Sequence, residues 1–154
     1  MSSLVYGADE FVAQWAMARL PMMRVGFGAC VAIGVAEANR LIAAIVYYNY
    51  RPSCGSIEMA VAAERGTPWC SRQNLSAFFD YPFRQLQCRS IHIACARNNR
   101  HAKKFVARIG FKPAGLLRRG FGTADAVLYD MLPDECRWLR NSNGQRQPIA
   151  AARA

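Results

Sequence analysis

The sequence lacks long apolar runs, and it is short of acidic residues. No segment approaches the roughly 20 uninterrupted apolar residues that a membrane helix requires. Residues 1–10 do not combine a basic start with an apolar run, the pattern of a secretory signal. We therefore expect a cytoplasmic protein without a membrane partner. Ten Asp and Glu stand against 20 Lys and Arg, which gives a net charge of +10.

All but three of the basic residues are arginines. A guanidinium group holds phosphate or carboxylate through two parallel hydrogen bonds, so an arginine-rich surface suits nucleic acid, a phosphorylated cofactor or an acidic protein. The composition does not choose among these partners, and a solvated basic surface is an equally good interpretation. Because no DNA-reading motif accompanies the charge, nucleic acid is the weakest of these candidates.

Cysteine spacing argues against a metal site. None of the six cysteines forms the Cys-x-x-Cys pair of a zinc ribbon or a thioredoxin-type motif. A chain of this size needs no disulfides to fold. We expect reduced thiols that are buried or half-buried, and no metal.

Apolar residues make up 53% of the chain and charged residues 19%, which is enough for one core. We expect one domain at residues 1–140 and a flexible tail at 141–154. Periodicity and turn residues predict a helix, three strands, a helix, a strand, a helix and two strands, at residues 9–20, 28–37, 41–50, 56–63, 71–86, 90–96, 100–109, 111–119 and 126–132.

This order predicts an α/β (α+β) domain with a mixed, mostly antiparallel central sheet flanked by helices. Pro82 should kink or divide the second helix, and Gly110 should end the third. An exposed strand edge near residues 126–132 would allow two subunits to pair as a homodimer.

The third strand, the second helix and the fourth strand form a βαβ unit if the two strands are neighbours. Open α/β sheets bind ligands at the loop that follows the carboxyl end of such a strand. A helix N-terminus there presents free N–H groups to an anion. Gly66, Ser71 and Arg72 lie at this junction.

Residues 98–111 (NNRHAKKFVARIGF) and 114–118 (AGLLR) carry a more specific pattern. They resemble the Asn, helix, Gly-Phe and downstream Arg of the GNAT acetyltransferase superfamily, within it the branch of ribosomal-protein alanine acetyltransferases. Residues 130–131 and 135–138 are similar to the closing strand and acidic–aromatic end of that family, so the resemblance covers roughly residues 58–138. The Trp-Cys-Ser-Arg sequence at 69–72 also resembles compact GNAT-like proteins of tailed bacteriophages, some of them linked to virions.

The resemblance implies acetyl-CoA as cofactor, with these contacts: Ala62, Ala63, Gly66, Trp69, Cys70, Ser71, Arg72, Asn98, Asn99, Lys103 and Phe105. Backbone N–H groups near Ala62 and Ala63 would polarise the thioester carbonyl, and Asn98 or Asn99 would contact the pantetheine arm. The family loop normally has glycines where Cys70 and Arg72 stand. Either Arg72 replaces the backbone contacts with a guanidinium clamp, or the pocket no longer holds the cofactor.

The resemblance further implies direct attack by a protein or small-molecule amine, after a general base has removed its proton. Glu58 and Glu64 are the available acids, and Glu58 is preferred because the family often has an acid at the start of this strand. Each is as readily a surface residue of the sheet. Val106 stands where many members have a Tyr that protonates the departing thiolate.

Two rival interpretations remain open beside the acetyltransferase. A non-catalytic GNAT-fold binding protein, a virion component or a modulator of a host protein, is favoured by Cys70, Arg72 and Val106. A basic nucleic-acid binder ranks last. His92, between Ile91 and Ile93, is typical of a hydrogen-bonded core residue rather than a catalytic one.

Overall fold

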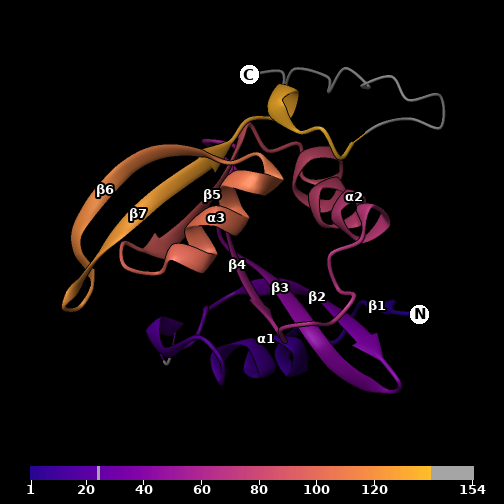
Figure 1. Ribbon diagram of the computed structural model, residues 1–154. Coiled ribbons are helices and arrows are strands. Elements are labelled where there is room, and N and C mark those ends of the chain that lie inside the picture. Colours follow the sequence, from indigo (N-terminus) through magenta and orange to yellow (C-terminus); the bar gives the residue numbers. More distant parts are fainter. Residues whose placement is uncertain (24, 140–154) are drawn as a thin grey trace.

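The computed structural model of the protein describes residues 1–23 and 25–139. Its elements are β1 (Ser3–Val5), α1 (Asp9–Met17), η1 (Pro21–Met23), β2 (Cys30–Glu37), β3 (Arg40–Arg51), β4 (Ser56–Ala63), α2 (Arg72–Asp80), η2 (Tyr81–Gln85), β5 (Ser90–Ala96), α3 (Arg100–Ile109), β6 (Lys112–Phe121), β7 (Ala124–Met131) and η3 (Pro133–Glu135) (Figure 1). The tail expected at residues 141–154 lies outside the described part of the chain.

The strands form one mixed sheet in the order β1-β2-β3-β4-β5-β7-β6. Every neighbouring pair is antiparallel except β4 and β5, which are parallel. The parallel pairing runs only from Ser56 and Ser90 to Glu58 and His92, and beyond it the two strands diverge (Figure 1). The predicted mixed α/β fold and its βαβ unit are confirmed.

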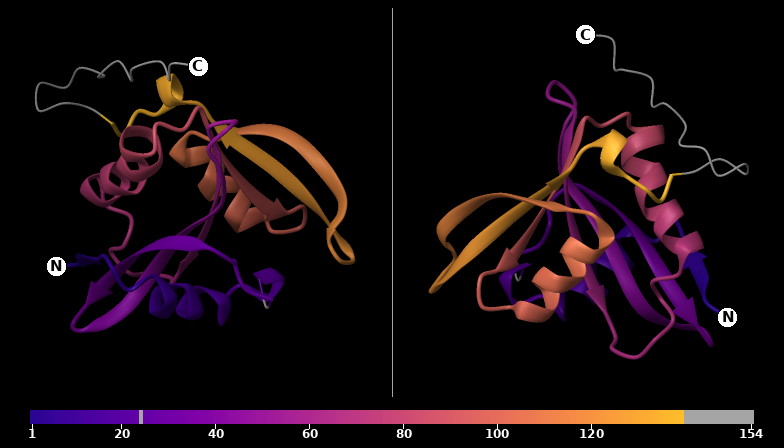
Figure 2. Two further views of the ribbon diagram at one scale, coloured as in Figure 1. Left: turned by 180° about the vertical axis from the view of Figure 1, so that it is seen from behind. Right: turned by 45° about the horizontal axis from the view of Figure 1, so that its top comes forward.

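Helices cover the two faces of the sheet unequally. α2 and α3 lie over one face, where they bury a core that draws on β2, β3, β4, β5 and β7. α1 lies against the other face and packs on residues of β2, β3 and β4 (Figure 2). On that second face the side chains of His92 and Ala94 are exposed, so no helix of the described chain covers β5 there.

Local sequence accounts for the best-predicted boundaries. β4, β5 and α3 begin and end where the sequence predicts, because apolar alternation or helical spacing ends there at turn residues. α3 ends at Gly110, whose φ of 114° turns the chain back while Phe111 donates to the carbonyl of Val106. Pro82 divides the second helix as expected, since α2 stops at Asp80 and a π-helical turn follows.

Other boundaries are wrong. α1 stops at Met17, three residues before the predicted end, and the strand β1 was not predicted because three residues show no period. The proposed pairing edge at residues 126–132 is also wrong, because β7 lies between β5 and β6. The edge strand on this side of the sheet is β6, which is exposed along nearly its whole length.

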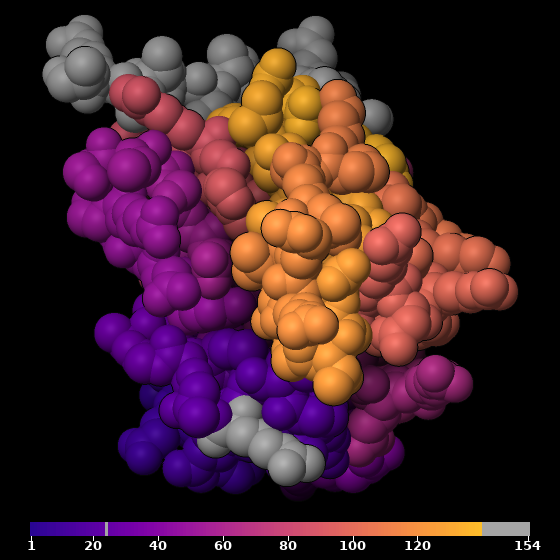
Figure 3. Space-filling view, turned by 90° about the vertical axis from the view of Figure 1, so that its left-hand side faces the viewer, coloured from indigo at the N-terminus to yellow at the C-terminus, as the bar shows by residue number. Residues whose placement is uncertain are grey.

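Figure 3 shows the β6–β7 hairpin (orange) in front of the molecule, between residues of β3 and β4 (purple) and those of α3 (salmon). Cys54 is exposed, which corrects the expectation that all the thiols are at least half-buried. Within the described residues, no helix is long and apolar enough to cross a membrane, and no three His, Cys, Asp or Glu side chains are grouped as metal ligands would be.

Candidate active site

The divergence of β4 from β5 exposes the backbone of β4 toward the gap between the strands. The Glu64 N–H donates to the Ile42 carbonyl of β3. In an antiparallel pair the backbone groups of every second residue point to the same neighbour, so Glu64 and every second residue before it direct their N–H and C=O groups at β3. The intervening residues Val61 and Ala63 therefore direct their N–H and C=O groups toward β5, and no strand of the described chain pairs with them. The backbone N–H and C=O groups of Ala62, in contrast, are directed at β3 and not at the gap.

Glu58 lies at the point where the two strands part. Its carboxylate accepts a hydrogen bond from Asn49 Nδ2 at 2.9 Å and another from the Tyr48 hydroxyl. Burial, the charge of Glu58 and this hydrogen bond together raise the pKa of Tyr48 to about 12, so the phenol stays protonated and keeps donating. Tyr48 packs on Phe27 in the α1-side core, with 5.2 Å between ring centroids, which places Glu58 on the same face as α1.

His92 faces Glu58 across the parallel pairing, and both side chains lie on the open half of the α1 face. The ring is exposed and its Nε2 lies 2.8 Å from Ser90 Oγ. The prediction of a core histidine is therefore wrong, although the hydrogen bond it assumed is present. Ile91 and Ile93 are buried under the helices, and His92 alternates to the face that no helix covers.

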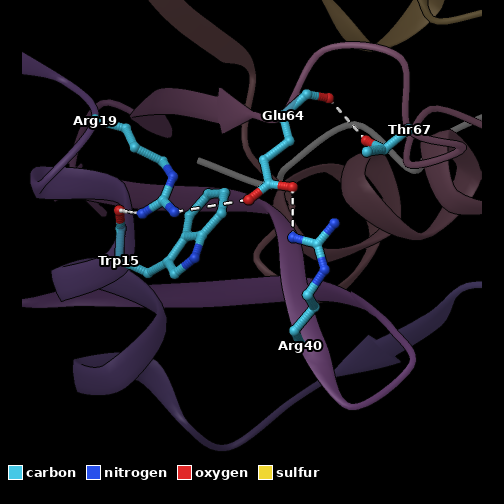
Figure 4. A network of polar contacts seen from close by, with 5 residues as sticks. All are labelled: Trp15, Arg19, Arg40, Glu64 and Thr67. Carbon is cyan, nitrogen blue, oxygen red and sulfur yellow. Dashed lines mark hydrogen bonds and ion pairs between the residues drawn. The ribbon is translucent and has the colours of Figure 1, made fainter.

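Glu64, the second predicted acid, lies at the end of β4 in an arginine network (Figure 4). Its carboxylate is 2.6 Å from Arg40 Nη1 and 3.7 Å from Arg19 Nη2. The Arg19 guanidinium stacks on Trp15, 3.6 Å from the ring centroid, and Thr67 Oγ1 donates to the Glu64 carbonyl at 2.7 Å. Both carboxylate oxygens are engaged, and the network joins α1, the β2–β3 hairpin and the loop after β4.

That loop leads into α2 through a tightly bonded turn. Ser71 caps the helix, its hydroxyl accepting from the Asn74 N–H at 3.1 Å. The buried Asn74 side chain donates to the Trp69 carbonyl at 2.9 Å and so fixes the turn from inside. In the described chain, the N–H groups of Arg72 and Gln73 meet no acceptor, and the space around Gly66, with φ of 74°, is open.

Trp69 and Phe105 were both predicted to contact a cofactor, and here they contact each other. Their ring centroids are 5.2 Å apart, and Trp69 also stacks on Phe78 at 6.4 Å. This aromatic contact joins the loop before α2 to α3 beside a small apolar pocket, which is lined by Ile45, Met59, Val61, Trp69, Leu75, Phe78, Phe79, Phe105 and Ile109.

Cys70 and Arg72, the two residues expected at glycine positions of the loop, differ in exposure. Cys70 is half-buried against the core, and burial raises the pKa of its thiol. Arg72 is exposed, and its guanidinium carbon lies 6.0 Å from the ring centroid of Trp138. Of these two residues, only Arg72 has a charged side chain that is exposed at the surface.

The remaining predicted residues follow β5, on the other side of the strand gap. Asn99 caps α3, its Oδ1 accepting from the Ala102 N–H at 3.1 Å, and Asn98 is exposed beside it. Lys103 is half-buried one turn into the helix, and its ammonium opposes the effect of burial, which raises the pKa of Cys95 to about 11.

These features fit an extended coenzyme with a thioester end and a phosphorylated end. Unpaired strand backbone at Val61 and Ala63 matches an amide-bearing arm, and the free N–H groups that begin α2 match a phosphate. Arg72 adds a guanidinium at the same helix end. Trp69 narrows the space between the helices through its ring contacts with Phe78 and Phe105.

No protein-family model matches the sequence, and no curated protein matches it. Solved structures do match. A variant of the spermidine N-acetyltransferase SpeG from Vibrio cholerae covers 94% of this chain and 98% of its own, with a TM-score of 0.71 and 16% identity. A dodecameric structure of that acetyltransferase in an intermediate state covers 92% and 98%, with a TM-score of 0.68 and 18% identity. The chain has the GNAT acetyltransferase fold. A structure named "Probable acetyltransferase" agrees, with a TM-score of 0.66, 16% identity and coverage of 87% and 94%.

Within this GNAT fold, sequence reasoning missed the residues that surround Glu58. Tyr48 and Asn49 follow from the register of β3 against β4, which is set by the bulge and turn between Tyr48 and Ser56. A regular register counted from the pair of Arg51 and Ser56 would place Asn49 opposite Glu58, and the bulge shifts the partner to Tyr48. The exposure of His92 carried no local signal, because it depends on which half of the sheet α1 covers.

Proposed function

We propose that the protein is an N-acetyltransferase that transfers the acetyl group of acetyl-CoA to an amine by direct attack. The observation that carries this proposal is the divergence of β4 and β5 immediately beyond an acidic residue held by two hydrogen-bond donors. The GNAT fold of the chain supports the choice of reaction. When bound, the coenzyme supplies an activated acetyl thioester.

Residues on the α2 and α3 side would hold the coenzyme. The N–H groups of Val61 and Ala63 are directed at the strand gap, where they would bind the pantetheine arm and stabilise negative charge on the thioester carbonyl. Gly66, Ser71 and the N–H groups at the start of α2 would face the pyrophosphate, with Arg72 replacing glycine contacts. Asn98, Asn99 and Lys103 would border the arm from β5 and α3.

Glu58 would act as the general base. Its carboxylate accepts from two neutral donors, Asn49 and Tyr48, and it faces the open half of the sheet. Glu64 has two guanidinium partners instead, so its role is to hold the loop that precedes α2. Val106 is buried in the core and supplies no acid, so the departing thiolate would take its proton from water.

The acceptor would approach over the face that α1 leaves open, opposite the coenzyme. The protein carries a net charge of +10, which opposes the approach of a polycation such as spermidine, the acceptor named for the structural neighbour from Vibrio cholerae. We therefore propose a neutral or acidic acceptor, with a protein N-terminus of the kind that the alanine acetyltransferase branch modifies as the leading choice.

The test is an acceptor panel with acetyl-CoA, read by release of coenzyme thiol and by the mass of the product. Three acceptors suffice: a peptide that begins with Ala and has acidic residues, a matched peptide with basic residues, and spermidine. We expect acetylation of the acidic peptide to exceed that of the basic peptide and of spermidine. If none of the acceptors is acetylated while the coenzyme binds, the enzyme assignment is refuted.

A non-catalytic GNAT-fold binding protein is the second candidate. It is favoured by the contact between Trp69 and Phe105 and by Cys70 in place of a glycine, since both fill space that a coenzyme would use. A calorimetric titration with acetyl-CoA separates the two functions, because this candidate predicts no binding. A phage virion component would belong to this second class.

A further inference from the structure

We propose that His92 carries the proton away from Glu58 to solvent during turnover. This inference rests on the proposed function and adds a second residue to it. In the direct-attack reaction, the amine nitrogen bonds to the acetyl carbon, and the carbon–sulfur bond breaks with its electron pair passing to sulfur. The proton that leaves the nitrogen goes first to the Glu58 carboxylate. Before the next turnover, Glu58 must lose that proton.

Two strands flank Glu58, and they offer it different proton acceptors. On the β3 side, Asn49 Nδ2 and the Tyr48 hydroxyl both donate to the carboxylate. Neither group is a good proton acceptor. The amide nitrogen of Asn49 is not basic, and the Tyr48 phenol, with a pKa of about 12, is already protonated. On the β5 side, His92 faces Glu58 directly across the parallel pairing. Neighbouring strands lie about 4.8 Å apart, so the two side chains are within reach of a hydrogen bond or of one bridging water.

The histidine is held in a way that suits transfer. Ser90 Oγ lies 2.8 Å from Nε2, which fixes the ring and leaves Nδ1 for the exchange with Glu58. The ring is exposed, so the imidazolium returns its proton to water. Imidazole is the side chain suited to this role near neutral pH, because its ordinary pKa is about 6.5.

Charged groups around His92 come from two neighbouring strands. Glu58 faces it from β4, and Asp130 pairs with it from β7. Lys112 lies one strand further, opposite Asp130, and is bound to Glu135 at 2.9 Å. The neutral ring accepts the proton from Glu58, and the imidazolium that results releases it to water.

The test compares His92→Ala with His101→Ala, the only other histidine of the chain. His101 is exposed at the start of α3 and serves as the matched control. We expect His92→Ala to lower kcat by about 10-fold, at or below the lower limit of general acid–base catalysis. Free imidazole should restore kcat in a saturable way, and acetyl-CoA affinity should not change. His101→Ala should match the wild type.

Two outcomes would overturn the relay. One is a His92→Ala enzyme with wild-type kcat at every pH and no response to imidazole. The other is a slow His92→Ala enzyme that imidazole does not restore but that His92→Gln does, since glutamine can hold a position and cannot carry a proton. Failure of the proposed function looks different: the wild type would acetylate no acceptor, and the relay would fall with it.

Discussion

Glu58 and Glu64 are six residues apart on one chain segment, and we propose opposite roles for them. Matched substitutions, Glu58→Gln and Glu64→Gln, should separate catalysis from stability. Each removes one negative charge and keeps the shape of the side chain. The first changes the residue at the strand gap, and the second changes the arginine network of Figure 4.

The expected losses follow from the contacts. Glu64→Gln weakens one close ion pair at 2.6 Å and one loose pair at 3.7 Å. Partly exposed pairs contribute about 0.2 to 1 kcal/mol each, so the free energy of unfolding should fall by about 1 kcal/mol. For a domain of this size that lowers Tm by about 2 to 4 °C. Its kcat should change less than about 3-fold, because no proton passes through it.

Glu58→Gln should show the reverse. The amide oxygen still accepts a hydrogen bond from Tyr48 or Asn49, so the free energy of unfolding should change by less than about 1 kcal/mol. Loss of the base should lower kcat by about 100-fold or more, while coenzyme affinity stays the same because Glu58 lies on the α1 face.

Thiol release and thermal unfolding measure both variants under identical conditions. The reasoning is refuted if Glu64→Gln loses catalysis to the same degree as Glu58→Gln, or if Glu58→Gln weakens coenzyme binding while its kcat is unchanged.

Three further predictions concern the elements that hold the site. Ser71→Ala removes the cap that accepts from the Asn74 N–H, and thermal unfolding should show a loss of about 1 kcal/mol; an unchanged Tm would contradict the cap. Gly110→Ala places a side chain at a φ of 114° and should cost about 1 to 2 kcal/mol in urea unfolding; a stabilised variant would contradict the strain. Lys112 and the Leu132 N–H lower the pKa of Glu135, so this carboxylate stabilises the fold above its unfolded pKa and stops doing so as the pH falls through its lower folded value. The Tm difference between wild type and Glu135→Gln should therefore be present at pH 6 and shrink as the pH falls below the unfolded pKa of the carboxyl, and a difference that stays constant over that range would be contrary evidence.

The segment from β4 to α3 could be predicted almost to the residue, for local reasons. Ser56 to Ala63 alternates between faces, Ser71 has the side chain of a helix cap, and Gly110 has the freedom to end a helix. These features act within a few residues of one another, so a single sequence contains them.

The errors arose where distant segments decide the outcome. The sheet order places β7 inside and β6 outside, although β6 precedes it in the chain. His92 has apolar neighbours on both sides in sequence, but its exposure depends on the position of α1. The contact between Trp69 and Phe105 joins residues 36 positions apart, one in the loop before α2 and one in α3. None of these relations is encoded in a local pattern.

The central claim, that this site binds a coenzyme at the gap between β4 and β5, is tested most directly by calorimetric titration with acetyl-CoA. Ala63→Pro is the matched variant: it removes an N–H that faces the gap and is not used in the pairing with β3. We predict micromolar binding of acetyl-CoA and coenzyme A to the wild type at two salt concentrations, much weaker binding of ATP, and at least 10-fold weaker coenzyme binding to Ala63→Pro. No binding of acetyl-CoA, or equal binding of ATP that added salt abolishes, would contradict the account.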